Sequence, residues 1–289
     1  MLRIFYGLAI ILLVPDHVSN LDAVETSSTT EGPKYWPRPD SLLLFAPLDG
    51  EYRLDDMITG RMPKLHDNLG LLRSEIGPYG QPNTSYTVSK TGFLCEFDHL
   101  PQFSSFTLAL YFLTPCNDSG GILAIEGQYT FPHRLSLVYK NRNLEIHRYN
   151  YEGQFSSNFA STASLSSNVW TFIGITYDRI KRRLILYNDK GQAIFLRDNF
   201  DVLDNSNVRL FLAYARDGNT FHLMKPSDAM ACVMLYDSVL TNEEMAQLPS
   251  VCKLKGRKGT FDQLNTAAKF IPNFLNIFLN ICLLFFCQL

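Results

Sequence analysis

The sequence is poor in charged residues, and its charges nearly cancel. Charged residues make up 19% of the chain, and 26 Lys and Arg against 28 Asp and Glu leave a formal net charge of -2. A chain this balanced lacks the long-range attraction to phosphate on which nucleic-acid binding depends, and it contains no basic stripe with interleaved aromatic residues. Nucleic-acid binding is therefore excluded as a main function.

The signatures of common catalytic and metal sites are missing as well. The sequence contains no Gly-x-Ser-x-Gly elbow, no phosphate-binding loop and no dinucleotide fingerprint. It has no Cys-x-x-Cys pair, and its six His residues are scattered without metal-ligand spacing. We therefore expect no catalytic residues, and binding becomes the class of function to consider.

A largely apolar run lies near each end of the chain. The first spans residues 4–14, follows a short basic start and is broken by Pro15. It has the length of a signal-peptide core and is too short to cross a bilayer. We expect a signal peptide over residues 1–19, with an uncleaved anchor or a buried helix as the alternative.

The second apolar run covers residues 270–289, carries no charge and follows a basic linker over residues 253–269. It is long enough to span a bilayer, but Asn273, Asn276 and Asn280 form a polar stripe at helical spacing. Membrane attachment through this tail is expected. A lipid-anchor signal, a transmembrane helix and a surface helix are all left open.

Four cysteines lie in the body of the chain, which allows three pairings. We expect the two sequence-local disulfides, Cys95 with Cys116 and Cys232 with Cys252. Each would close a loop of about 20 residues and contribute about 3 kcal/mol in the loop-entropy model. The alternative is buried free thiols, which an oxidising compartment disfavours. Asn83 and Asn117 begin glycosylation sequons, which matter only if the chain is secreted.

The body reads as a single domain over residues 41–252, after a flexible lead-in over residues 20–40. Residues 51–88 are rich in Gly and Pro, so we expect an irregular wrap along the edge of the domain. Beyond it, short apolar or alternating runs are separated by Gly, Pro or Asn at intervals of about ten residues. This rhythm predicts an all-β sandwich or barrel.

Residues 169–189 form the clearest local pattern, two strands joined by a short basic turn. In the first strand both alternating faces are largely apolar, so it should lie where other layers cover it on both sides. Near the end of the domain, residues 229–236 predict another strand. Thr241, with Glu244 three residues later, predicts a capping box at the start of a short helix.

These two stretches resemble laminin G-like domains of the concanavalin A-like lectin and glucanase superfamily, in its pentraxin-like branch. The matching features are Trp170 followed by the alternating hairpin, and the final strand with its Leu-Thr-x-x-Glu helix start and closing Cys252. The resemblance covers residues 41–252. It implies a two-sheet antiparallel jelly-roll sandwich with one short C-terminal helix, followed here by the hydrophobic tail.

The superfamily includes glucan hydrolases that carry paired Glu residues on one strand as Glu-x-Asp-x-x-Glu. Glu96 and Asp98 echo this motif, but the second Glu is missing. The resemblance therefore implies a protein that is not an enzyme. A hydrolase of the same fold is the competing class, and it would need a second carboxylate from another strand.

Two sets of residues are candidates for ligand binding. Alternation places Glu145, His147, Tyr149 and Tyr151 on one strand face, where the rings could hold a sugar or a protein loop; the bland alternative is a solvated polar face. Relatives bind calcium through Asp, Asn and carbonyl oxygens at the rim of the sandwich. Asp217 and Asn219 could supply such oxygens, although a plain turn would have the same composition.

We therefore expect a secreted or cell-surface module that binds a glycan or an extracellular protein without catalysis, with Ca²⁺ as its possible cofactor. A structural matrix component with no discrete ligand site is the alternative.

Overall fold

The computed structural model describes residues 37–49, 54–64, 72–88, 95–101, 103–115, 118–127, 134–149, 155–189, 191–196, 208–217 and 220–253. All of them belong to one compact unit, residues 32–289. The predicted signal peptide, almost all of the lead-in and linker, and the hydrophobic tail lie outside the described residues. Within the described ranges, no helix combines the length and the apolar character needed to cross a membrane.

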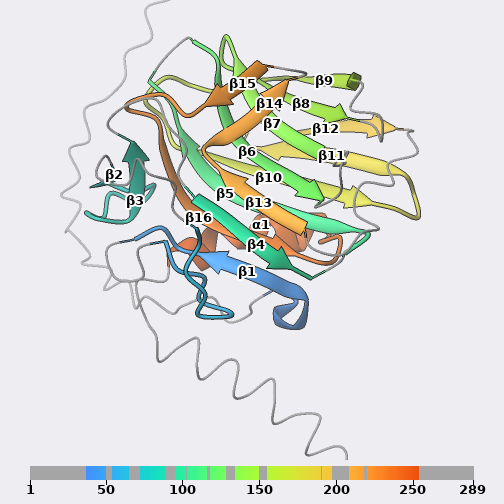
Figure 1. Ribbon diagram of the computed structural model, residues 1–289, viewed down its shortest axis with the longest axis horizontal. Coiled ribbons are helices and arrows are strands. Elements are labelled where there is room, and N and C mark those ends of the chain that lie inside the picture. The colour runs from blue at the N-terminus through green and yellow to red at the C-terminus, as the bar shows by residue number, and fades with distance from the viewer. Residues whose placement is uncertain are drawn as a thin grey trace, which may run out of the picture. The chain divides into compact units, whose positions relative to one another are not determined.

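Two antiparallel sheets form the body of the protein (Figure 1). The larger sheet has eight strands in the order β12-β11-β10-β5-β16-β3-β2, with β1 also paired to β16. Its strands are β1 (Leu42–Ala46), β2 (Leu72–Glu75), β3 (Ser85–Val88), β5 (Phe106–Leu113), β10 (Thr171–Asp178), β11 (Arg183–Asn188), β12 (Gly191–Leu196) and β16 (Ala229–Tyr236).

The smaller sheet has six strands in the order β4-β13-β6-β7-β8-β9. They are β4 (Cys95–Leu100), β6 (Gly120–Gly127), β7 (Arg134–Lys140), β8 (Asn143–Tyr149), β9 (Phe155–Ser164) and β13 (Val208–Leu212). A separate hairpin, β14 (Tyr214–Asp217) and β15 (Thr220–Leu223), crosses in front of this sheet in Figure 1. The helical elements are a short 3-10 turn, η1 (Pro39–Ser41), and α1 (Asn242–Cys252). The all-β sandwich fold is thus confirmed.

The predicted central hairpin is present as β10 and β11, and both faces of β10 are covered as expected. Ile173 and Ile175 enter the core between the two sheets, whereas Phe172 joins a second cluster beneath α1. Gly174 lies on the covered outer face, where a methyl group would collide with the end of the Met245 side chain from α1. A strand that is apolar on both faces therefore has a layer packed against each of them.

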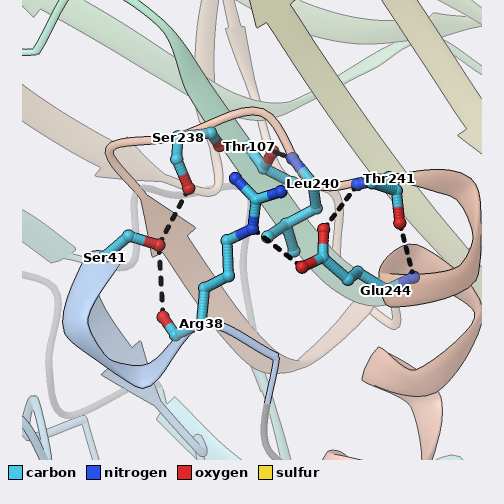
Figure 2. Close-up of polar contacts among 7 residues, drawn as sticks. All are labelled: Arg38, Ser41, Thr107, Ser238, Leu240, Thr241 and Glu244. Atoms are coloured by element: carbon cyan, nitrogen blue, oxygen red, sulfur yellow. Dashed lines mark hydrogen bonds and ion pairs between the residues drawn. The ribbon is translucent and has the colours of Figure 1, made fainter.

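The helix α1 begins as the sequence predicted. Thr241 Oγ1 accepts a hydrogen bond from the Glu244 backbone N–H, and Glu244 Oε2 accepts one from the Thr241 N–H at 2.7 Å. Figure 2 shows how Arg38, before β1, contacts the same carboxylate, while the Ser238 hydroxyl donates to Ser41 Oγ. Together these contacts attach the first strand and the helix to the same end of the eight-stranded sheet.

One of the two expected disulfides is present, and the pairing of Cys95 with Cys116 stays a prediction. Cys232 and Cys252 are joined, which connects the end of α1 to β16. Cys95, by contrast, is a free and fully buried thiol, and Cys116 lies outside the described residues. Cys95 shares the core-facing side of β4 with Phe97, so its sulfur lies among the buried apolar residues between the sheets.

The expectation of an irregular wrap over residues 51–88 is also only partly correct. Much of it is turn and loop, but β2 and β3 pair with each other, and β3 continues the eight-stranded sheet beside β16. This ribbon of two short strands, here called the β2–β3 ribbon, forms one side of the cleft described next.

Candidate functional site

A cleft of about 370 Å³ lies on the outer face of the eight-stranded sheet. Its floor follows one cross-strand row: Arg73 pairs with Thr87, Thr87 with Ala229, and Ala229 with Leu113. Residues that lie directly opposite one another in antiparallel strands project from the same face. The floor therefore crosses four strands, roughly 14 Å at ordinary strand spacing, and the small side chains of Thr87 and Ala229 leave space above its middle.

Large side chains stand at both ends of this row. Trp170 directly precedes β10 and lines the cleft at one end, where it also packs against the cluster beneath α1. Arg73 and Glu75, two residues apart on β2, line the other end, and both are exposed. The arrangement places an aromatic side chain at one end of the floor, and a guanidinium and a carboxylate at the other.

The remaining wall is a turn that includes Pro226 and Ser227. Ser227 has a φ of 75°, in the left-handed region that residues other than Gly rarely adopt. The turn is held from below by Asp228, whose Oδ2 accepts hydrogen bonds from the Tyr139 hydroxyl at 2.6 Å and from the Lys225 N–H at 3.1 Å. Burial raises the pKa of Asp228. The wall is thus fixed by groups in the interior of the sandwich.

The outer face of the six-stranded sheet carries a second group of polar and aromatic residues. Arg209 lies 3.6 Å from Glu96 and 3.5 Å from Glu126, between two carboxylates that are both buried. Its guanidinium also lies 5.2 Å from the ring centre of Phe211, and Arg216 lies 4.9 Å from that of Phe221. These cations are already stacked on rings of the protein, so the cleft is the better candidate site.

The structure places Glu145 and His147 together on the outer face of β8, as alternation predicted. His147 Nε2 lies 3.0 Å from Glu145 Oε2, and the His147 side chain is only 2% exposed. Ser136, which pairs with His147, is fully buried and accepts a hydrogen bond from the Arg216 N–H of β14. Tyr149 ends β8, but its side chain and all of Tyr151 lie outside the description. Neither Glu145 nor His147 lines the cleft.

The candidate calcium residues lie in the hairpin formed by β14 and β15. Asp217 is the last residue of β14 and pairs with Thr220, so residues 218 and 219 connect the two strands. The Asp217 side chain and Asn219 lie outside the description. In the part of the chain that the structure describes, no group of three or more His, Cys, Asp or Glu residues is arranged to hold a metal ion.

Of the two sequons, Asn83 is described and Asn117 is not. Asn83 lies in the exposed turn between β2 and β3, and its Oδ1 accepts a hydrogen bond from the Ser74 hydroxyl at 3.2 Å. The cleft residues themselves were missed by sequence reasoning. Trp170 was noted only as part of the hairpin, and Arg73 and Glu75 belong to a stretch interpreted as irregular.

Comparison with known proteins gives similarity in fold only. No protein-family model matches the chain, and no characterised protein matches it in sequence. Among solved structures, domain 4 of AbnA, an extracellular GH43 arabinanase from Geobacillus stearothermophilus in complex with arabinotriose, is similar with a TM-score of 0.53 at 14% identity. That match covers 72% of this chain and 98% of the other.

Two further solved structures are similar at lower scores. The heptameric SAP-like pentraxin from Limulus polyphemus has a TM-score of 0.43 at 14% identity, over 60% of this chain and 81% of the other. The botulinum neurotoxin serotype D binding domain has a TM-score of 0.46 at 16% identity, over 71% of this chain and half of the other. The chain thus shares the jelly-roll-like all-β sandwich fold of AbnA domain 4.

Proposed function

We propose that the protein is a non-catalytic glycan-binding module and that its ligand is a short oligosaccharide held in the cleft between Trp170 and Arg73. The observation that carries the proposal is the arrangement of the cleft, with an aromatic ring at one end and a charged donor and acceptor at the other. A sugar ring has an apolar face that stacks on an aromatic ring and hydroxyl groups that bond to charged side chains.

The size and position of the cleft support this proposal. Its volume of about 370 Å³ falls within the usual range for small-molecule sites. The floor lies on paired strands, which hold binding residues more firmly than loops do. The similarity in fold to AbnA domain 4, which was solved in complex with arabinotriose, supports a sugar chain as the ligand.

The carboxylates that a hydrolase of this fold would need support the proposal that the module is not an enzyme. Glu96 on β4 and Glu126 on β6 do come from different strands, but both contact Arg209 and are 6% and 4% exposed. A buried carboxylate that already contacts a guanidinium is poorly placed to protonate or attack a glycosidic bond. Among the described residues that line the cleft, Glu75 is the one carboxylate, so the pair of carboxylates that a hydrolase uses is not found there.

The proposed setting is outside the cell, as a secreted or membrane-attached laminin G-like domain. The Cys232–Cys252 disulfide supports an oxidising compartment, and Asn83 lies on an exposed turn where a glycan chain would fit. In this setting the N-terminal signal peptide directs secretion, the C-terminal tail attaches the protein to the membrane, and Asn117 is glycosylated. Calcium bound at Asp217 would be a cofactor of this module, and an extracellular protein is the alternative ligand.

A glycan array probed with the full-length chain, with calcium and again with a chelator, tests the proposal. Positive sugars would be titrated against Arg73→Ala, Glu75→Ala and Trp170→Phe. Hydrogen bonds to charged groups contribute about 1.5–3 kcal/mol, so each of the first two variants should weaken binding roughly tenfold or more. Lys140→Ala, an exposed charge at the end of β7, is the matched control and should bind as the parent does.

Three results would count against the proposal. If no sugar on the array is bound in either condition, the ligand is not a glycan, and extracellular proteins become the candidates. Binding unaffected by the Arg73 and Glu75 variants would place the site elsewhere, with the stacked residues around Phe221 next in order. Turnover of any bound glycan would show that the module is an enzyme after all.

A further inference from the structure

The turn between β10 and β11 carries an apolar side chain at its apex. Residues 179–182 form the turn, and Ile180 is 93% exposed, the most exposed large apolar side chain among the described residues. The backbone around it is held in place: the Arg182 N–H donates to the Arg179 carbonyl at 3.2 Å, and the Lys181 N–H donates to Asp178 Oδ1 at 3.0 Å. Ile180 is therefore presented by an ordered turn.

Positive charges surround this apex. Arg179, Lys181 and Arg182 are exposed, and Arg183 is partly buried at the start of β11. Asp178 is the one carboxylate of the segment, and it lies 3.5 Å from Lys181 Nζ. Four cations and one carboxylate give residues 178–183 a formal charge of +3, on a chain whose net charge is -2. The positive charge is thus concentrated where the apolar apex projects.

We propose that this turn, residues 179–182 with Arg183, is a docking site for an anionic lipid surface. Polar residues and Gly normally occupy such turns, so an exposed Ile has no role in forming this one. At the surface of a bilayer, Ile180 would enter the region between headgroups and acyl chains, while the cations would contact lipid phosphates and carboxylates. The charge and the apolar apex thus suit the same partner.

The apolar apex is what favours a lipid surface over a sulfated polysaccharide. A polyanion would contact the same cations, but it would gain nothing from Ile180, because a chain of sulfated sugars has no apolar interior for the side chain to enter. The proposal predicts that the apolar side chain and the cations contribute separately. A cation near an anionic bilayer is worth about fivefold in binding, and burial of an Ile side chain roughly tenfold or more.

Docking through this turn would orient the module. The turn lies at one end of β10, and Trp170 of the cleft lies just before its other end. Eight residues of extended strand separate the two, roughly 26 Å. A bilayer bound at the turn therefore leaves the cleft open to the opposite side. This docking site does not depend on the proposed glycan function.

Co-sedimentation of the full-length chain with lipid vesicles tests the proposal. One set of vesicles contains phosphatidylcholine alone, and the other about one third phosphatidylserine. The parent is compared with Ile180→Ser and with the double variant Lys181→Gln, Arg182→Gln. Val169→Ser is the matched control, because Val169 is also an exposed apolar residue, at 52%, beyond the opposite end of β10. Binding to immobilised heparin is measured in parallel.

We expect binding that requires phosphatidylserine and weakens as salt is raised. Ile180→Ser should weaken it roughly tenfold, the double variant about 25-fold, and Val169→Ser should leave it unchanged. Equal binding to both kinds of vesicle, or equal binding by parent and Ile180→Ser, would overturn the proposal, since another part of the chain would then carry the affinity. Heparin binding without vesicle binding would assign the turn to a polyanion instead.

Discussion

Arg38 Nε lies 2.7 Å from Glu244 Oε1, and this contact joins two residues that are 206 positions apart in the sequence. Glu244 uses its other oxygen to complete the capping box with Thr241, so a single carboxylate both caps α1 and holds the segment before β1 (Figure 2). The two ends of the domain are therefore closed by one side chain.

Replacing Glu244 by Ala should lower the free energy of unfolding by about 1–2 kcal/mol, because the capping box and the ion pair are lost together. Glu244→Gln keeps an acceptor for the Thr241 N–H and should cost about 0.5 kcal/mol. Glu243→Ala, in the same turn of the helix but outside the box, is the control and should change little. Urea denaturation measures all three, and equal costs for Glu243→Ala and Glu244→Ala would contradict the assignment.

The same carboxylate makes stability depend on pH. Burial acts to raise the pKa of Glu244, but hydrogen bonding to Thr241 and the contact with Arg38 outweigh it and hold the pKa below its ordinary value. A carboxyl with a lowered folded-state pKa stabilises the protein fully above its unfolded-state pKa, about 4.3 for Glu, and this contribution disappears as pH falls through the folded-state value. The gap in stability between parent and Glu244→Gln should therefore close below pH 4 or so. A gap that persisted in acid would show that the charge is not responsible.

Gly121 and Gly127 in β6 offer a matched test of how the β14–β15 hairpin sits on the six-stranded sheet. A methyl group at Gly121 would collide with the carbonyl oxygen of His222 and lie 2.5 Å from the Ala215 nitrogen, whereas one at Gly127 would meet nothing within 4 Å. Gly121→Ala should cost about 1–3 kcal/mol, since backbone atoms must move. Gly127→Ala should be close to neutral in the same thermal or chemical denaturation, and equal effects would argue against this packing.

Cys95 should resist alkylation in the folded protein. Burial raises the pKa of its thiol, so the reactive thiolate is scarce and the sulfur is out of reach of reagent. Treatment with iodoacetamide followed by peptide mass spectrometry should label Cys95 only after denaturation, without any reductant. Recovery of Cys95 in a disulfide-linked peptide with Cys116 would restore the pairing first expected from the sequence.

The features that local sequence could reveal were predicted well. The hairpin of residues 169–189, the capping box at Thr241 and the Cys232–Cys252 pairing each depend on residues close together in the chain, where strand alternation and helix capping apply directly.

The candidate site could not be predicted in the same way. Arg73, Thr87, Leu113, Trp170 and Ala229 come from separate parts of the chain, and only the strand order β2-β3-β16-β5-β10 brings them into one row. Alternation correctly placed Glu145 and His147 on one face, but not the burial of His147 beside a strand that contacts β14. Strand order and the covering of a face are tertiary facts, and no spacing within one strand records them.

The β2–β3 ribbon, which carries Arg73 and Glu75, is attached to the rest of the sheet by two residue pairs, Thr87 with Ala229 and Tyr86 with Met230. A short ribbon at the edge of a sheet opens locally at lower free energy than the whole domain unfolds. Amide hydrogens of this ribbon should exchange faster than those of β5 or β10, and a ligand that bridges Arg73 and Trp170 should slow them. Recognition in the cleft and the local order of this edge ribbon are therefore thermodynamically linked.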